Sequence, residues 1–294
     1  MVYLLKMRRS GTLYGIILFV VFINCNVALR AQTSNDTSHS KYLSIGPRRA
    51  GICFGNSHKY TGLRFNLVDR KVKRVNIFNL AFITKTRVMN GLSVGIAVDN
   101  DSIGNGLAFS IAFTGGEHRN GVTIGGLACG QQVANGFALG GIYYTAHFLN
   151  GIGIGGGWCI LKKANGFAFG GAELSADTLN GLFVGGGVEC GRVDTINERD
   201  TSFGRMKGVA IALWETEAVK LTGLAISILY THIIKQHGVS IAIYNNSSEL
   251  HGLQIGLLNH AANNPKGLQW LPFINMHFGK SSVASHQSTV KEKQ

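Results

Sequence analysis

The sequence lacks the features that define several common protein classes. Its forty glycines do not recur at every third position, so a collagen triple helix is excluded. Apolar residues make up 45% of the 294 residues and the mean hydropathy is +0.15. That is enough apolar material to bury an extended core, and it argues against intrinsic disorder. We therefore expect a folded chain whose high glycine content reflects its structure.

Recognisable catalytic and ligand-binding motifs are also missing. The sequence contains no Gly-x-Ser-x-Gly elbow, no Cys–His pair with a supporting carboxylate and no His-Glu-x-x-His spacing. The glycines of residues 151–156 invite a dinucleotide-binding interpretation, but no helix pattern follows them. Glu173 and Glu189 fall on predicted strands. A position at the rim of the strand explains each glutamate without a catalytic role. We predict that the protein is not an enzyme and has no catalytic residue, cofactor or metal.

The N-terminus resembles a secretory signal. Lys6, Arg8 and Arg9 precede an apolar segment at 16–23, and a small residue, Ala31, comes before a polar start. The apolar segment is too short for a comfortable membrane span. Removal of residues 1–31 leaves 24 basic and 15 acidic residues, a net charge of +9. We therefore predict an exported chain that stays basic.

Cysteine is scarce, and its placement argues against disulfides. Cys25 lacks the preceding small residues of a lipoprotein signal, so we expect no lipidation. Cys129 and Cys159 occupy equivalent places two repeat units apart, and stacked units would hold them about 9.5 Å apart. That separation is too long for a bridge. We expect these two cysteines, with Cys53 and Cys190, to act as small buried hydrophobes.

The dominant feature of the chain is a dipeptide, Asn-Gly, that returns every fifteen residues from Asn90 to Gly181. A fixed period of this kind indicates a repeat architecture. After a twelve-residue insertion, glycine still recurs at its place in the repeat, but Lys, Thr or His precedes it instead of asparagine. A backbone requirement at glycine explains this, either positive φ or close approach. The repeat glycines are Gly91, Gly106, Gly121, Gly136, Gly151, Gly166, Gly181, Gly208, Gly223, Gly238, Gly252 and Gly267.

Each repeat glycine is followed by an alternation of large and small residues. Large apolar residues such as Leu92, Val94 and Ile96 stand at odd places, and Ser, Gly or Ala stand between them. This period of two predicts a strand with one bulky and one nearly bare face. About seven polar or mixed residues then lead to the next strand.

Two all-β folds accommodate such a unit. In a parallel β-solenoid of about 15 residues per turn, an eight-residue strand is followed by a seven-residue return, and like residues stack on like. In an outer-membrane β-barrel, about 14 antiparallel strands place the large residues toward lipid. Equal spacing and small inward residues favour the solenoid, whereas faces free of charge favour the barrel. We predict the solenoid and keep the barrel, as a pore or transporter, as the alternative.

The repeat defines the organisation of the chain. We predict a signal peptide at 1–31, a polar linker and N-terminal cap at 32–60, a β-repeat domain at 61–278 and a disordered tail at 279–294. An insertion at 190–207 interrupts the repeat domain and is expected to form a surface loop. Residues 42–54, 61–68 and 75–82 are predicted to be strands of degenerate early units that cap the stack.

Other surface features have modest predicted roles. The basic run from Arg70 to Arg74 is expected to be a solvated cap, with lipopolysaccharide or an acidic polymer as an alternative ligand. His237 and His251 share the place before the repeat glycine and are predicted to stack on the surface. Ice binding would need a regular threonine array, and the matching positions do not supply one: Ser93, Ala108, Thr123, Ala138, Gly153 and Ala168.

The C-terminal units resemble those of a bacterial surface-repeat family. The segment Gly-Leu-Gln-Ile-Gly-Leu-Leu-Asn at 252–259, and the related segment at 264–275, are similar to the Gly-Leu-Gln-Ile-Gly-Leu-x-Asn units of these exported proteins, some of them lipoproteins. The resemblance covers about residues 61–278. It implies a location in the cell envelope, at the outer membrane or cell surface of a bacterium, and no established activity. We expect a structural or binding role, with an envelope polymer, lipopolysaccharide or membrane as partner, and no nucleic acid.

Overall fold

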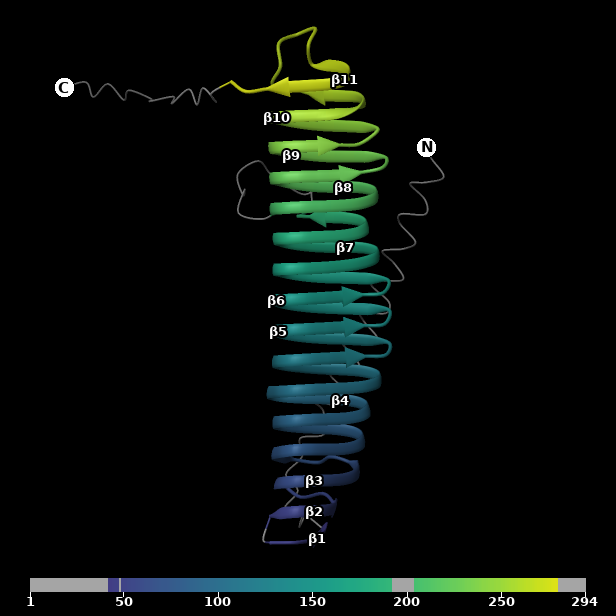
Figure 1. The fold of residues 1–294 in the computed structure, drawn as a ribbon, viewed down its shortest axis with the longest axis vertical. Helices are drawn as coiled ribbons and strands as arrows, with labels where there is room; N and C mark the ends of the chain where they lie inside the picture. Colours follow the sequence, from purple (N-terminus) through teal and green to yellow (C-terminus); the bar gives the residue numbers. More distant parts are fainter. Residues whose placement is uncertain (1–41, 48, 192–203, 280–294) are drawn as a thin grey trace, which may run out of the picture. The chain divides into compact units, whose positions relative to one another are not determined.

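The structure is a computed structural model that describes residues 42–47, 49–191 and 204–279. The chain divides into two units, Met1–Ser40 and Lys41–Gln294, and all described residues belong to the second. The described part of this unit is a parallel β-solenoid of about 13 turns (Figure 1), and 86% of the described residues are strand. The strands are β1 Tyr42–Ile45, β2 Ala50–Gly55, β3 Lys59–Val68, β4 Val72–Gly125, β5 Ala128–Gly140, β6 Tyr143–Gly155, β7 Trp158–Cys190, β8 Arg205–Ser227, β9 Tyr230–Ile241, β10 Tyr244–Ala261 and β11 Trp270–His277.

Successive turns of the solenoid, here called coils, are paired in parallel and in register. Gly121 lies beside Gly136, Gly136 beside Gly151 and Gly151 beside Gly166, so each repeat glycine contacts the equivalent residue of the next coil. Antiparallel pairs occur in the described residues at the two ends of the stack, between β1 and β2 and between β10 and β11. The predicted solenoid is therefore confirmed, and the alternative of an antiparallel barrel is wrong.

Each coil contains two strand segments rather than one strand and an irregular return. In the coil that begins at Gly136, the first segment ends at Gly140 and the second, from Tyr143, pairs in parallel with residues 158–165 of the next coil. The prediction of a seven-residue return without strand structure is therefore wrong. The return also alternates inward and outward side chains, and its backbone groups find partners in neighbouring coils, as buried backbone requires. We call the segments after the repeat glycines the first sheet and the return segments the second sheet.

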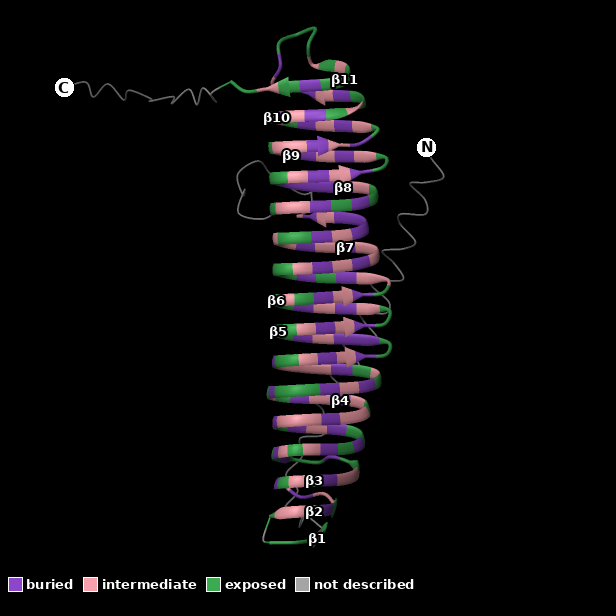
Figure 2. Ribbon diagram, viewed as in Figure 1, coloured by how far each residue is buried: buried purple, intermediate pink, exposed green. Residues whose placement is uncertain are grey.

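In most coils of the first sheet the small residues face the interior and the large ones face outward. In one coil the buried side chains are Ala138 from the first sheet and Tyr144, Ala146 and Leu149 from the second. At Gly153 an added Cβ would lie 2.5 Å from the Tyr144 ring and 2.6 Å from Leu149 Cδ2. The two sheets are thus too close for large side chains from both. Figure 2 shows the resulting alternation of buried and more exposed residues along each coil.

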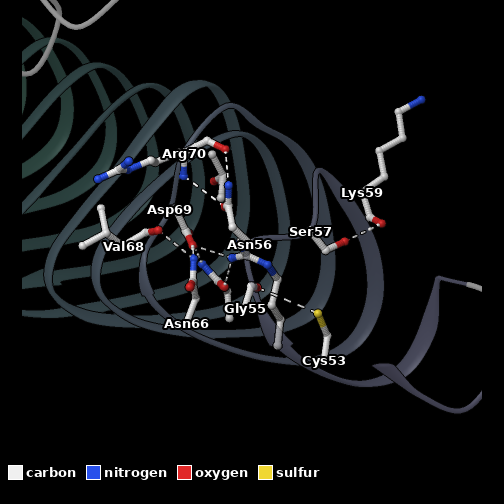
Figure 3. Close-up of polar contacts among 12 residues, drawn as sticks. Cys53, Gly55, Asn56, Ser57, Lys59, Asn66, Val68, Asp69 and Arg70 are labelled. Carbon is white, nitrogen blue, oxygen red and sulfur yellow. Dashed lines mark hydrogen bonds and ion pairs between the residues drawn. The ribbon is translucent and has the colours of Figure 1, made fainter. Parts of the chain in front are cut away.

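Polar side chains replace this apolar core near the N-terminal end. The guanidinium of Arg64 is buried, forms an ion pair with Asp69 and donates a hydrogen bond of 2.7 Å to Asn79 Oδ1. Asp69 also accepts hydrogen bonds from Asn66 and Asn79, both at 2.9 Å. Figure 3 shows Asp69 beside Asn66, with the hydrogen bond between them dashed. A buried pair with all these partners is compatible with folding because its charges are matched.

Both ends of the stack are closed by reversed strands. Residues 42–54 were predicted as one strand, but they form β1 and β2, joined through positive φ at Gly46 and Arg49. At the other end β11 runs back along β10, so that Gly252 pairs with His277. The predicted signal peptide, nearly all of the linker before β1, most of the 190–207 insertion and nearly all of the C-terminal tail lie outside the described residues.

Candidate binding surface

The outward side chains of the first sheet form a continuous apolar surface along the solenoid. They make two rows, which follow the repeat-glycine place by one and by three residues, and we call them together the apolar face. The first row is Ile52, Leu63, Phe78, Leu92, Leu107, Val122, Phe137, Ile152, Phe167, Leu182, Val209, Leu224, Val239 and Leu253. The second row is Phe54, Phe65, Leu80, Val94, Phe109, Ile124, Leu139, Ile154, Phe169, Val184, Ile211, Ile226, Ile241 and Ile255.

Every side chain of the apolar face is exposed or half-buried, and the residue between the two rows is buried in every coil. Leu107 is 43% exposed and Ile152 41%. No charged residue stands in either row. Exposed apolar residues at the following corner widen the surface in several coils: Ile96, Ile111, Leu127, Ile142, Leu213, Ile228, Ile243 and Leu257. A patch of this extent is unusual on a soluble monomer and is typical of an interaction site.

The edge of the apolar face is set by the repeat glycines. Gly151 has φ of 131°, and a Cβ there would lie 2.2 Å from the carbonyl oxygen of Gly136 in the preceding coil. Close approach and positive φ both apply, which only glycine tolerates without strain. Ile77 holds the same place with φ of 88° and is 57% exposed. Gly267 lies in the turn before β11, where an added Cβ would meet no atom within 4 Å.

A ladder of asparagine side chains runs beside these glycines. In the central coils each Nδ2 donates to the Oδ1 of the asparagine one coil earlier, at 2.8 to 2.9 Å. The rungs are Asn76, Asn90, Asn105, Asn120, Asn135, Asn150, Asn165 and Asn180. Such ladders are typical of in-register parallel strands. The sequence predicts a backbone requirement at glycine alone, although the fifteen-residue recurrence of asparagine is a visible signal for the ladder.

The charged side chains of the central coils lie on the second sheet, away from the apolar face. Lys163 stands beside Phe148, and farther along the same row Lys220 stands beside Lys235, which forms an ion pair of 3.4 Å with Glu249. The basic run from Arg70 to Arg74 spans the end of the turn after β3 and the first residues of β4, and its four basic residues are exposed while its Val72 is buried. The molecule is thus amphipathic, with one apolar sheet surface and one mixed polar surface.

Histidines gather at the C-terminal end of the solenoid. The rings of His237 and His251 stack with centroids 4.8 Å apart, which confirms the predicted stack. Burial, together with the nearby charges of His251 and Lys220, lowers the pKa of His237 from its ordinary value of 6.5. Burial likewise lowers the pKa of His260, whose ring stacks on Trp270 at 4.2 Å. These contacts favour neutral imidazoles.

The four cysteines of the described residues are free and buried. Tyr144 stands between Cys129 and Cys159 in the ladder, so the two thiols belong to coils two apart, as the sequence predicts. Burial raises the pKa of Cys129 and of Cys190 to about 12. A thiol with so high a pKa holds almost no thiolate at neutral pH and is a poor nucleophile.

The other residues that the sequence offers as candidates for a catalytic or binding role have structural places in the repeat. Glu173 and Glu189 are half-buried on β7. The glycines of 151–156 span β6 and the corner after it, and no helix follows them among the described residues. The positions compared for ice binding face the interior in every coil: Ser93, Ala108, Thr123, Ala138, Gly153 and Ala168.

Within the described part of the chain, no three His, Cys, Asp or Glu side chains come together in a metal-binding arrangement. No segment there forms a helix of membrane-spanning length and hydrophobicity. Comparisons with family models, with curated proteins and with solved structures found no match to this chain.

Proposed function

We propose that this protein is an exported, non-enzymatic repeat protein of the bacterial cell envelope, and that the apolar face is its structural or binding surface. The observation that carries the proposal is the continuity of that face. Two rows of large apolar side chains run from β2 to β10 without a charged residue. Folding does not require them to be apolar, because the core is closed by the buried residues between them. Their retention in every coil indicates a contact outside the chain.

The N-terminal sequence supports export. A basic start, an apolar segment at 16–23 and a small residue at Ala31 are the parts of a secretory signal. The partners that fit an exported protein with an apolar surface are other envelope components. The exposed basic residues of the second sheet and of 70–74 would then face an acidic polymer or lipopolysaccharide phosphates.

Fractionation of bacterial cells that express the full chain tests this proposal. We expect the chain in the envelope fraction, with an intact mass that lacks residues 1–31. As a matched control, Phe19→Asp and Val20→Asp together break the apolar segment without touching the repeat, and this variant is expected to stay unprocessed in the cytosol. A wild-type chain of full mass in the cytosolic fraction would contradict the proposal.

A further inference from the structure

We propose that the apolar face is the interface between two copies of this chain, which dock face to face. The proposal deepens the function given above and rests on its assignment of the apolar face as the binding surface. It names one occupant for that surface. Four features of the structure support a second copy: the area of the face, its flatness, its freedom from charge and the position of the basic residues.

The area of the face matches what a stable dimer needs. About 13 turns, spaced about 4.8 Å apart, give a length of about 60 Å. The two rows and the corner beside them span about five residues of strand, or about 13 Å. The product is about 800 Å², which equals the area that each partner contributes to a standard protein–protein interface.

The face is flat as well as large. The coils lie nearly parallel in a straight column (Figure 1), and equivalent glycines stay in register from coil to coil. Flat sheets of many strands are typically stabilised by stacking or by side-chain ladders. Here the second sheet covers the inner side of the first sheet, and the outer side of the first sheet is left for a flat partner. Two such faces would pack about 10 Å apart, with the side chains of each set between those of the other. A second copy offers a surface of the same shape and length.

The distribution of charge permits self-association. The chain without residues 1–31 carries a net charge of +9, so two copies repel each other wherever their basic surfaces meet. Contact through the apolar face avoids this repulsion, because neither row holds a charge and residues such as Lys163 and Lys220 lie on the second sheet. The docked arrangement places these lysines on the two outer surfaces of the dimer.

The same distribution disfavours a lipid surface as the occupant. A protein that lies on a membrane through an apolar surface usually surrounds that surface with lysine and arginine, which contact anionic headgroups. Here the neighbouring row is the asparagine ladder. From Ala50 to His251 that row contains one basic residue, Lys207. The basic side chains of the central coils are instead on the sheet that would face away from lipid.

A matched pair of substitutions in one coil tests the proposal. Ile152 on the apolar face is 41% exposed, and Ile160 on the second sheet is 40% exposed. Both are strand isoleucines, so the change to aspartate perturbs the monomer similarly. Ile152 also lies near the middle of the solenoid, where two copies meet whether they run in the same or in opposite directions. The chain is purified from expressing cells without detergent, and its mass is measured by sedimentation and by light scattering.

We expect a dimer for the wild-type chain and for Ile160→Asp. Ile152→Asp should raise the dissociation constant at least ~100-fold, because it buries carboxylates without partners. Circular dichroism shows whether each variant is folded. Should Ile152→Asp fail to fold, Ile152→Thr keeps a β-branched side chain and should still weaken the dimer roughly tenfold.

Other results would overturn the proposal. A wild-type chain that is monomeric at high micromolar concentration excludes it, as does equal weakening by Ile152→Asp and Ile160→Asp. A monomer that floats with phosphatidylglycerol vesicles, and loses this binding in Ile152→Asp, identifies lipid as the occupant instead. These outcomes are separate from the fractionation result, because a dimeric chain found unprocessed in the cytosol would refute only export.

Discussion

Replacement of one repeat glycine by alanine tests why glycine holds its place in every central coil. In Gly151→Ala the new Cβ lies 2.2 Å from the Gly136 carbonyl oxygen and 3.0 Å from the Gly136 carbonyl carbon. The contacted atoms are backbone, and neighbouring coils fix them on both sides. The substitution therefore cannot be relieved by rotation of a flexible side chain.

The expected cost has two parts. A non-glycine residue at a φ of 131° is strained by about 1 to 3 kcal/mol. Relief of the contact requires a local shift of two coils, comparable to overpacking a core, which costs about 1 to 3 kcal/mol. The sum is about 2 to 6 kcal/mol, which is large against the usual effect of a point mutation.

Gly267→Ala is the matched control. Gly267 also has positive φ, 96°, but an added Cβ meets nothing within 4 Å, so only the strain remains. Urea unfolding followed by far-ultraviolet circular dichroism measures both variants, compared at equal m-values. We expect Gly151→Ala to lose about 1 to 3 kcal/mol more than Gly267→Ala, the share that belongs to the close approach. Equal losses would refute the assignment of close approach between coils.

Three further predictions concern the same edge of the solenoid. Ile77→Gly should raise stability by about 1 kcal/mol in urea unfolding, because Ile77 is exposed and holds a φ of 88°; a loss of stability would contradict the strain. Asn150→Ala should cost about 1 to 2 kcal/mol, since it removes two ladder hydrogen bonds, and Asn180→Ala about half as much, since Asn180 ends the described ladder; equal costs would argue against the ladder. The lowered pKa of His237 means that the unfolded chain binds its proton more readily, so this residue should lower the melting temperature as pH falls through about 6.5. His237→Asn should reduce that fall between pH 7.5 and 5, and an unchanged fall would contradict the prediction.

Much of the fold can be predicted from the sequence because the solenoid repeats one structural unit of about fifteen residues. The fifteen-residue period and the alternation of large and small residues predict stacked parallel strands, and the stacked His237 and His251 follow from their shared place. The sequence alone does not show which side of the alternating strand faces the interior. Alternation shows that Leu139 and Ala138 point to opposite sides, but only the close contact between the two sheets makes the small side the interior.

The return segments and the C-terminal end were less predictable for physical reasons. The return breaks its alternation where two successive residues, His147 and Phe148, both face outward, so its strand pattern is masked. Gly267 keeps the fifteen-residue spacing, yet the chain turns there and β11 reverses along β10. Spacing along the sequence cannot show where a stack of coils ends, because the cap depends on what the last coil leaves unpaired.

The distance between equivalent residues of neighbouring coils is the most direct test of the parallel stacking in the solenoid. Cysteines introduced at Val122 and Phe137, in a chain that lacks residues 1–31 and so Cys25, can carry spin labels selectively, because the other four native cysteines are buried. The two residues pair in the parallel ladder, so their Cα atoms should lie about 5 Å apart. Electron paramagnetic resonance spectra of chains diluted with unlabelled protein should show strong dipolar broadening. In an antiparallel arrangement with one unit per strand, the same residues would lie at opposite strand ends, about 23 Å apart. Absence of broadening would contradict the stacked parallel solenoid.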